Sequence, residues 1–309
     1  MNKDSKIYIA GHRGLVGSAI VRKLTSEGYN NLILKNHSEL DLLNQQAVHN
    51  FFQTGKPEYV FLAAAKVGGI MANKSQKADF IYQNLQIQNN IIHNAYLTGA
   101  KKLLFLGSSC IYPKLCPQPI KEEYLLTGPL EETNDAYALA KIAGIKMCQS
   151  YNEQHGTNYI SAMPTNLYGP NDNFDLQNSH VFPALIRKFH EAKQNNLPAV
   201  TLWGTGNVYR EFLHVDDLVD ALLFLMQNYN NSEIINVGSG KDLTIKELAE
   251  IIKETVNYTG NIEWDLTKPD GTPKKLLNVN KLNNLGWKAK TNLKDGIAQT
   301  YEWYINNLK

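Results

Sequence analysis

The first half of the chain alternates short apolar runs with longer segments of helical periodicity. The apolar runs have the length of buried strands and lie at residues 6–10, 31–35, 59–65, 102–109 and 158–165. Helices are predicted between them, from the turn after the first run to the C-cap Gly28, and at 47–55, 79–97 and 136–154. Buried strands that alternate with helices build parallel sheets from βαβ units. The pattern therefore predicts an α/β fold around a doubly wound parallel sheet.

The order of elements loosens after residue 170. Helices are predicted at 181–194 and 216–228, and the run "AVTLW" at 199–203 is predicted to be an isolated strand. We therefore expect two domains. The first spans 1–170 and carries the parallel sheet, with later segments at about 205–240 returning to it. The second, mainly 171–309, is expected to be a smaller α/β lobe that binds the substrate.

A glycine-rich turn follows the first predicted strand. The stretch "AGHRGLVG" places Gly11, Gly14 and Gly17 at three-residue intervals between that strand and the first helix. Such a turn lets the backbone approach a pyrophosphate, whose charge is met by the free N–H groups of the helix N-terminus. Glycines in a turn can also serve packing alone. The strand before and the helix after favour a dinucleotide site in a Rossmann-type domain.

The end of the second strand indicates which dinucleotide is bound. An acidic residue there would bind the ribose 2′-hydroxyl of NAD, but the sequence reads "LKNHS", with Lys35 and His37. Arg13 lies within the glycine turn itself. Because these cations suit a 2′-phosphate, we predict NADP(H); the alternative is that they only form a solvated strand end.

Composition narrows the class of protein. Of 309 residues, 43% are hydrophobic and 19% charged, which indicates a globular protein with a sizeable core. The net charge of +2, without a basic run, argues against nucleic acid as the main partner. No membrane-spanning run or signal-peptide core is present, so we expect a cytoplasmic protein with no membrane partner. Three cysteines without C-x-x-C spacing predict reduced thiols and no metal site.

Candidate catalytic residues lie near the middle of the chain. Tyr137 and Lys141 are four residues apart on a predicted helix and therefore share one face. A lysine ammonium beside a phenol favours the phenolate and can lower its pKa. Ser108 and Ser109 follow the fourth predicted strand, where open α/β sheets gather ligands. A serine hydroxyl there can share a substrate oxygen with Tyr137.

Several blocks of sequence together resemble the extended short-chain dehydrogenase/reductase family over nearly the whole chain. They are "AGHRGLVGSA", "AAAKVGGI", "FLGSSCIYP", "PTNLYGP", "SHVFPALIRKFHEA" and "REFLHVDD". Within the family the resemblance narrows to a bifunctional epimerase and reductase. It implies epimerisation at C3 and C5 of GDP-4-keto-6-deoxy-D-mannose, followed by NADPH-dependent reduction of C4 to give GDP-L-fucose. The dehydratases of the family differ from this chain, because they carry an acidic residue at the position of Cys110.

The resemblance also implies the catalytic roles. Inverting a centre beside a ketone needs a base on one face and an acid on the other, and the resemblance assigns these roles to Cys110 and His180. Tyr137 stabilises the enolate and protonates the C4 oxygen, Ser108 assists, and Lys141 holds tyrosine and cofactor. The alternatives are that Cys110 is a small buried hydrophobe and that His180 is an ordinary surface or core histidine.

Binding residues follow from the same resemblance. The cofactor residues it implies include Lys141 and His180 and are otherwise Gly11, His12, Arg13, Gly14, Leu15, Val16, Gly17, His37, Asp41, Leu42, Leu106, Gly107, Ser108, Ser109, Pro164, Thr165, Asn166 and Leu167. The implied substrate residues are Lys188, Trp203, Arg210 and Asp270. For Trp203, packing in the core of the second lobe is an equal alternative. Relatives often carry arginine at position 37, so His37 predicts a softer preference for NADP over NAD.

Three competing interpretations remain at this point. The first is a nucleotide-sugar epimerase or reductase with a different base or sugar. The second is a redox sensor that binds NADP(H) without chemistry, which would not need the five candidate catalytic side chains together. The third is a structural Rossmann-like subunit without a cofactor. The resemblance further suggests a homodimer built on the helices at 79–97 and 136–154.

Overall fold

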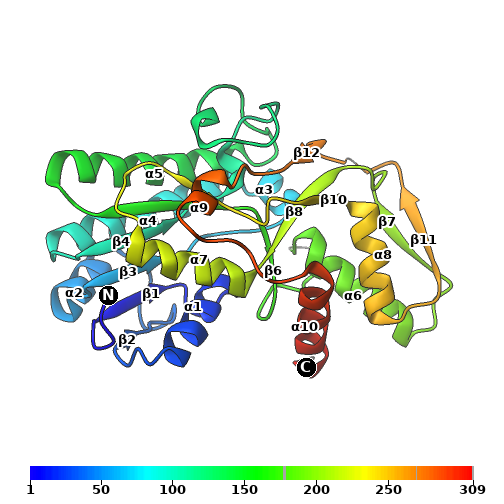
Figure 1. Cartoon of the computed structure of the whole chain (residues 1–309), viewed down its shortest axis with the longest axis horizontal. Helices are drawn as coiled ribbons and strands as arrows, with labels where there is room; N and C mark the ends of the chain where they lie inside the picture. Colours follow the sequence, from blue (N-terminus) through cyan, green and yellow to red (C-terminus); the bar gives the residue numbers. More distant parts are fainter. Residues whose placement is uncertain (177–178, 269, 308–309) are drawn as a thin grey trace.

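A six-stranded parallel sheet forms the larger part of the molecule (Figure 1). The computed structural model describes residues 1–176, 179–268 and 270–307. The strands of the sheet, in the spatial order β2-β1-β3-β4-β5-β9, are Leu32–Ile33, Ile7–Ala10, Tyr59–Leu62, Lys102–Leu106, Tyr159–Pro164 and Ile235–Val237. All neighbouring pairs run parallel. The predicted Rossmann-type sheet is therefore confirmed, and its carboxyl edge carries the turns that hold the candidate site.

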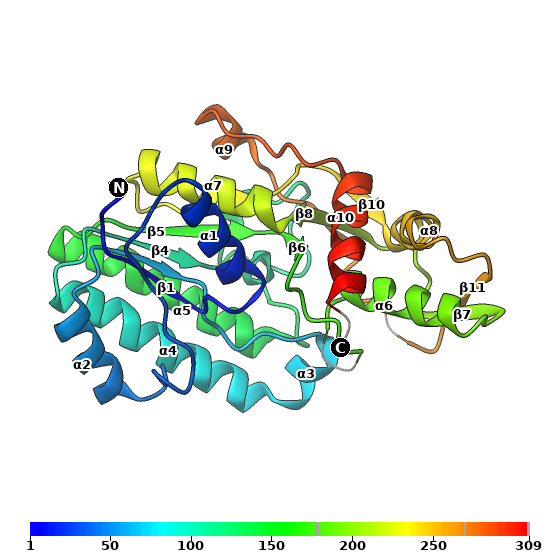
Figure 2. The same ribbon diagram turned by 90° about the horizontal axis from the view of Figure 1, so that it is seen from below.

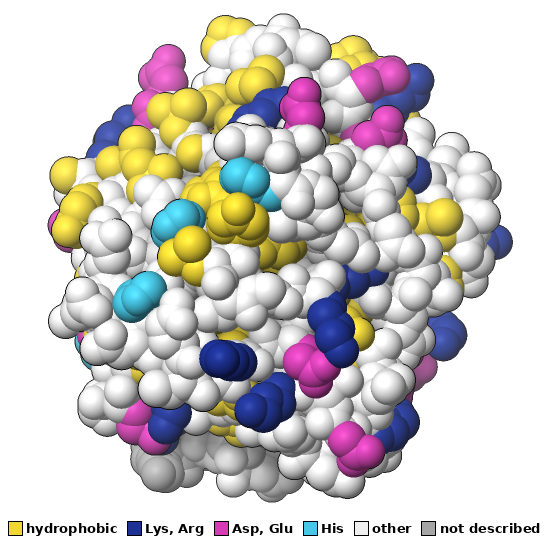
Figure 3. Space-filling model, turned by 90° about the vertical axis from the view of Figure 1, so that its left-hand side faces the viewer, with side chains coloured by type: hydrophobic (Ala, Val, Ile, Leu, Met, Phe, Trp, Pro, Cys, Tyr) yellow, Lys and Arg dark blue, Asp and Glu magenta, His cyan; other side chains and the backbone are white. Residues whose placement is uncertain are grey.

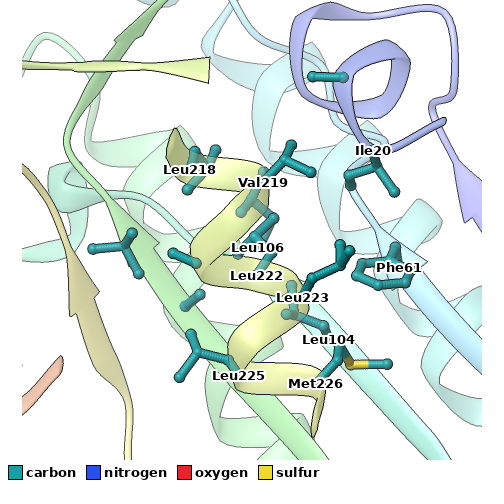
Figure 4. Close-up of a cluster of buried hydrophobic side chains, with 14 of the residues drawn as sticks. Ile20, Phe61, Leu104, Leu106, Leu218, Val219, Leu222, Leu223, Leu225 and Met226 are labelled. Atoms are coloured by element: carbon teal, nitrogen blue, oxygen red, sulfur yellow. The ribbon is translucent and has the colours of Figure 1, made fainter. Parts of the chain in front are cut away.

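Helices cover both faces of this sheet (Figure 2). On one face lie α1 (Leu15–Ser26) and α7 (Val215–Asn228), and on the other lie α2 (Gln45–Gly55), α4 (Lys77–Leu97) and α5 (Asp135–His155). Alternation along the strands makes both layers apolar, since Ile7 and Ile9 belong to the core cluster of α1 and α7 and Tyr8 to the cluster of the opposite helices. Figure 4 shows the first cluster, in which Leu104 and Leu106 of β4 lie against α7. Burial on both faces explains why the strands read as continuous apolar runs.

A smaller lobe stands at the carboxyl edge of the sheet (Figure 1). Its core is formed by α6 (Val181–Gln194), α8 (Ile245–Val256) and α10 (Leu293–Asn306) with the strands β7 (Ala199–Trp203) and β8 (Tyr209–His214). The prediction that 199–203 is an isolated strand is wrong. β7 pairs in parallel with β11 (Asn261–Asp265), a partner nearly sixty residues away whose mixed polar sequence gives little strand signal.

The second small sheet of the lobe borders the candidate site. In it β8 lies between β10 (Asp242–Thr244) and β12 (Lys274–Lys275), and β6 (Asn166–Tyr168) also pairs with β8. Between β4 and α5 the chain forms the loop at the top of Figure 1, which includes the short 3₁₀ helices η1 (Ser109–Ile111) and η2 (Glu122–Tyr124). The remaining helices are α3 (Ile70–Ser75) and α9 (Asn280–Asn284).

Within the described ranges, every helix is too short or too polar to cross a lipid bilayer.

Histidine and aromatic side chains gather where α4 and α5 end, on the side of the molecule away from the smaller lobe (Figure 3). Tyr96 stacks on His155 with ring centroids 4.3 Å apart, and His93 Nδ1 lies 2.7 Å from the Tyr151 hydroxyl. These contacts join the last turns of the two helices. They lie at the opposite end of the helices from Tyr137 and Lys141, which are near the start of α5.

Candidate active site

The glycine turn between β1 and α1 follows a path that only glycine permits at two positions. Gly11 has φ +85°, and a Cβ at position 17 would lie 2.1 Å from the Gly11 carbonyl oxygen. Helix α1 begins after Gly14 without any side-chain cap, so its first N–H groups are free to bind an anion. The ring atom His12 Nδ1 is buried and has no partner. These features fit the predicted pyrophosphate of a dinucleotide.

Acidic side chains lie beside the cationic residues that are predicted to bind the 2′-phosphate. Lys35 Nζ lies 3.6 Å from Glu39 Oε1, and His37 Nδ1 lies 3.7 Å from Asp41 Oδ1. Glu39 also accepts the Asn36 N–H at 2.9 Å, and this bond lowers the pKa of its carboxyl. No acidic residue stands at the strand end in the sequence, because Glu39 lies four residues after Lys35. Folding brings it back beside Lys35 through the turn at 36–40.

The other predicted cofactor residues lie along the carboxyl edge of the sheet. Gly107, just after β4, is buried against Met163, and a Cβ there would lie 2.4 Å from the Met163 sulfur. Beyond β5, the side chains of Thr165 and Asn166 both donate to the Glu211 carbonyl oxygen. Asp41 accepts the N–H of Leu43, while the Leu42 carbonyl accepts from Asn90. The remaining predicted residues lie in the same turns and strand ends: Leu15, Val16, Leu106, Ser109, Pro164 and Leu167.

Tyr137 and Lys141 lie in the first two turns of α5, beside the end of β4. Lys141 Nζ donates to the Leu106 carbonyl at 2.8 Å and lies 5.8 Å from the centre of the Tyr137 ring. Burial lowers the pKa of Lys141 to about 7. Burial raises the pKa of Tyr137, the charge of Cys110 raises it further, and a hydrogen bond with Ser108 opposes both. The predicted lowering of the Tyr137 pKa is therefore not found, because burial dominates and Lys141 turns toward a carbonyl.

Cys110 lies one residue into η1, at the end of β4, and its thiol faces a lysine. Lys275 Nζ, on β12, lies 3.3 Å from Cys110 Sγ, and the Ser108 hydroxyl accepts the Cys110 N–H at 3.2 Å. Burial by itself raises the pKa of Cys110. The charge of Lys275, hydrogen bonds from Ser108 and Lys275, and the more distant Arg210 together bring that pKa below its ordinary value. These groups favour the thiolate of Cys110, as a base at this position would need.

His180 is the residue before α6, on the smaller lobe. Its side chain is still reached by solvent, but the surrounding protein reduces its hydration and lowers the pKa of the imidazole. The charge of Lys275 lowers that pKa further. Lys275 thus acts on both members of the predicted acid–base pair.

Cys148, unlike Cys110, is 1% exposed inside the core between the sheet and α5, as its place in a helix predicts.

Two residues that contact the site have no clear sequence signal. Lys275 is one of two adjacent lysines in "TPKKLL", and only the pairing of β12 with β8 selects it over Lys274, whose Nζ lies 3.0 Å from Asp242. Phe80 packs edge-on against Tyr137 with ring centroids 6.3 Å apart. From sequence, a phenylalanine near the start of a helix is predicted only to be a core residue. Its contact with Tyr137 on another helix cannot be inferred from spacing.

The predicted nucleotide-binding residues lie on elements of the smaller lobe and contact one another in pairs. Trp203 is 55% exposed, so the interpretation of this residue as core packing is wrong. The ammonium groups of Lys188 and Lys268 lie 5.9 and 5.5 Å from the Trp203 ring centre. An exposed indole flanked by cations offers a stacking surface and positive charge together.

Asp270 fixes a turn beside Trp203. Its carboxylate accepts the Thr205 N–H at 2.7 Å and the Thr205 hydroxyl at 2.8 Å, and a Cβ at Gly204 would lie 2.2 Å from it. Arg210 Nη1 donates to the Tyr209 carbonyl, and its Nη2 lies 3.5 Å from the Asp270 carbonyl oxygen. Arg210 and Asp270 are therefore neighbours, as predicted residues of one site should be, although the carboxylate already has partners.

Known proteins similar to this chain carry a consistent set of descriptions. The model of the NAD dependent epimerase/dehydratase family matches residues 7–238. GDP-L-fucose synthase 1 of Arabidopsis thaliana is 62% identical over 99% of this chain and 95% of its own length. GDP-L-fucose synthase of Escherichia coli (strain K12) is 54% identical over 98% of this chain and 97% of its own. The structure of GDP-mannoheptose C4 reductase from Campylobacter jejuni, with NADP bound, is 47% identical, superimposes with a TM-score of 0.92 and covers 99% of each chain.

Proposed function

We propose that this chain, which belongs to the NAD dependent epimerase/dehydratase family, converts GDP-4-keto-6-deoxy-D-mannose to GDP-L-fucose by C3 and C5 epimerisation and NADPH-dependent reduction of C4. The observation that carries the epimerase half is the contact of 3.3 Å between Lys275 Nζ and Cys110 Sγ, which favours a thiolate beside Tyr137. A reductase that only transfers hydride to a ketone needs no such base. The similarity to GDP-L-fucose synthases over nearly the whole chain supports the same substrate.

Epimerisation follows from the acidity of the C–H bonds on either side of the C4 ketone. We propose that the Cys110 thiolate removes the proton from C3 or C5 and that His180 returns a proton from the opposite face. Burial and the charge of Lys275 both favour the neutral imidazole at His180, and the negative diphosphate of a sugar nucleotide bound near it would oppose them.

Reduction uses the groups at the end of β4 and the start of α5. Ser108 and Tyr137 hydrogen-bond the C4 oxygen, and the raised pKa of Tyr137 keeps its phenol protonated, as a donor to the developing alkoxide must be. Lys141, fixed on the Leu106 carbonyl, lies beside Tyr137 and positions the cofactor ribose. NADP(H) is held by the turn at 11–17, by Arg13, Lys35 and His37, and by the strand ends at 106–109 and 164–167. When bound, NADPH supplies the hydride for C4.

A second candidate function is favoured by the similarity to the GDP-mannoheptose C4 reductase. In that case the chain would reduce the C4 ketone of a GDP-heptose without epimerising it. The identity of 47% to that protein is lower than the 62% and 54% to the two synthases. Both candidates require NADPH and a 4-keto GDP-sugar, and they differ in the sugar and in whether it is epimerised.

One assay in deuterated water tests the proposal. Purified protein with NADPH and GDP-4-keto-6-deoxy-D-mannose should lose absorbance at about 340 nm, and NMR of the product should show GDP-L-fucose with deuterium at C3 and C5. Reduction without deuterium at either carbon would favour the C4 reductase. NADPH binding without turnover would overturn the proposed substrate and leave the cofactor site standing.

The variant Cys110→Ser separates the two half-reactions. We expect it to abolish deuterium exchange at C3 and C5, since a serine hydroxyl is far less acidic than a thiol, while NADPH binding is unchanged. Cys116→Ala is the matched control, because that thiol lies outside the proposed machinery and burial raises its pKa. Normal exchange in Cys110→Ser would remove the cysteine from the mechanism.

We also propose that the protein forms a homodimer through the outer surface of α4 and α5. The apolar side chains Tyr82, Leu97 and Leu139 on these helices are 62%, 47% and 48% exposed. Light scattering should give twice the chain mass of 34.8 kDa, and Leu139→Lys should halve it. A parent protein that stays at 34.8 kDa at micromolar concentration would contradict the dimer.

A further inference from the structure

A buried carboxylate lies on β8, the strand that pairs with β12. Glu211, on β8, is 0% exposed and follows Arg210, whose side chain belongs to the proposed substrate site. We propose that Glu211 is a positioning residue that holds β12 in the place where Lys275 contacts the Cys110 thiol. The inference rests on the proposed role of Cys110 as the base.

The contacts of Glu211 link three segments that are distant in sequence. Its Oε2 accepts the N–H of Leu277 at 2.9 Å, and its Oε1 accepts the N–H of Gly240 at 2.7 Å and the Ser239 hydroxyl at 3.4 Å. Burial raises the pKa of Glu211, and the N–H groups of Leu277 and Gly240 oppose this by donating to the ionised form. The Ser239 hydroxyl has a second acceptor, the Lys241 carbonyl at 3.2 Å. A buried carboxylate with these donors is costly to disturb, because losing it leaves N–H groups without partners.

The bond to Leu277 fixes the lysine two residues earlier. β12 pairs in parallel with β8, and Lys275 lies opposite Arg210. In an extended chain, residues two apart point to the same side, so a displacement at Leu277 carries Lys275 with it. On the other side of this segment, Leu276 donates to Gln118 Oε1 and accepts from Ile120. Toward β8, the segment is held by the backbone pairing of β12 and, beyond the end of that strand, by the contact of Leu277 with Glu211.

The carboxylate itself has no freedom to move sideways. A Cβ added at Gly238 would lie 2.3 Å from Glu211 Oε1 and 2.9 Å from its carboxyl carbon. The turn at 238–240 therefore closes over the carboxylate from one side while Leu277 meets it from the other. This close approach requires glycine at position 238. Substitution of Gly238 would therefore displace the Glu211 carboxylate without changing Glu211 itself.

Four groups surround the Cys110 thiol from the elements packed against it. Lys275 on β12 and Arg210 on β8 are cationic, Ser108 lies at the end of β4, and Tyr137 lies on α5. Of these, Lys275 is in direct contact with the sulfur, and Coulomb attraction falls with distance. Moving Lys275 away by even the width of one water molecule would weaken the attraction that favours the thiolate.

The rate of thiol alkylation tests the proposal without any sugar substrate. The background is Cys116→Ala, which leaves Cys110 as the only partly exposed thiol, since Cys148 is 1% exposed. Alkylation by iodoacetamide is followed from about pH 5 to 10 and confirmed by mass spectrometry. We expect Glu211→Gln to slow alkylation near pH 7 by about tenfold and to move the profile to higher pH, because the amide repels one N–H donor and releases β12.

Two controls separate positioning from ordinary loss of stability. Asp217→Asn is matched to Glu211→Gln, because Asp217, on α7, is also buried and accepts the N–H groups of Lys290 and Thr291. These three residues are not among the groups that act on the Cys110 thiol. It should lower the melting temperature and leave the alkylation profile unchanged. In a Lys275→Met background, Glu211→Gln should have no further effect on alkylation, because the cation it positions is gone.

The outcome that would overturn the proposal is also defined. If Glu211→Gln lowers the melting temperature but alkylates like the parent protein, Glu211 is structural only. If Glu211→Gln does not fold, Gly238→Ala takes its place, and a parent-like profile in that variant rejects the proposal. Failure of the proposed function is seen separately, as an absence of deuterium exchange in a protein whose thiol profile depends on Glu211 and Lys275.

Discussion

The two ends of the proposed substrate site differ in how much of their geometry is fixed by the protein itself. At the catalytic end, Lys141 is 4% and Ser109 3% exposed, and hydrogen bonds to β4 and within η1 hold this end in place. At the nucleotide end, Trp203 is 55% exposed, and its lysine neighbours lie more than 5 Å from the ring centre. In the proposed site, the catalytic end is therefore preorganised, whereas the nucleotide end would be completed by the ligand.

The difference follows from what surrounds each end. Apart from His180, the proposed catalytic residues follow the central strand β4 or lie at the start of α5, so they are fixed by a sheet with apolar layers on both faces. Trp203 ends β7, whose only sheet partner in the described chain is β11. A two-stranded ribbon gives a side chain little cover. Substitutions at the two ends should therefore differ in kind, with changes in kcat at one end and changes in KM at the other.

The largest effect is expected at the catalytic end, from Tyr137→Phe. Loss of the phenol removes the proton donor to C4, so kcat for NADPH oxidation should fall about 10²- to 10⁴-fold. The ring and its contact with Phe80 remain, so the melting temperature and NADPH binding should change little. Some deuterium exchange at C3 and C5 should remain, because Cys110 is still present as the base and Ser108 can still hydrogen-bond the C4 oxygen. Complete loss of exchange would mean that Tyr137 is indispensable for epimerisation as well.

A smaller but still severe effect is expected at the glycine turn. Gly17→Ala forces a Cβ to within 2.1 Å of the Gly11 carbonyl oxygen, so the turn must shift, at a cost of about 1–3 kcal/mol. NADPH affinity by fluorescence titration should fall at least about tenfold. Gly55→Ala is the control, because its Cβ would meet nothing closer than Phe51 at 3.7 Å. Unchanged affinity in Gly17→Ala would place the pyrophosphate elsewhere.

At the nucleotide end, Trp203→Ala should act on binding alone. Loss of the stacking surface should raise KM for the sugar nucleotide about tenfold, with kcat within about twofold and the melting temperature nearly unchanged. The contrasting variant is Trp287→Ala, where a 5% exposed indole that donates to Asp220 is lost. That variant should cost about 3–5 kcal/mol of stability and leave KM unchanged. The reverse pattern would return Trp203 to a structural role.

The smallest effect is expected from His37→Arg at the cofactor edge. The His37 side chain is 82% exposed and 3.7 Å from Asp41, so the substitution should fold normally. Arginine presents a fork of donors to a phosphate, and KM for NADPH should fall about threefold while KM for NADH is unchanged. Equal changes for both cofactors would show that position 37 does not contact the 2′-phosphate.

Most of the parallel-sheet half could be predicted from sequence because its signals are local. Apolar runs, the glycine turn before α1 and the spacing of Tyr137 and Lys141 each depend on neighbours within one element. In the smaller lobe such signals fail. β7 was predicted to be isolated because its partner β11 is far away in sequence, and the neighbours of Trp203 come from α6 and the segment after β11.

The sequence by itself determined the fold class, the dinucleotide turn and the identity of the candidate catalytic side chains. Only the tertiary structure decided which charges act on them. Lys275 meets Cys110 although 165 positions separate them, and Lys141 turns to the Leu106 carbonyl, while burial keeps the Tyr137 pKa high. The physical reason is that charge and burial act through space, so a protonation state depends on contacts that no periodicity along the chain records.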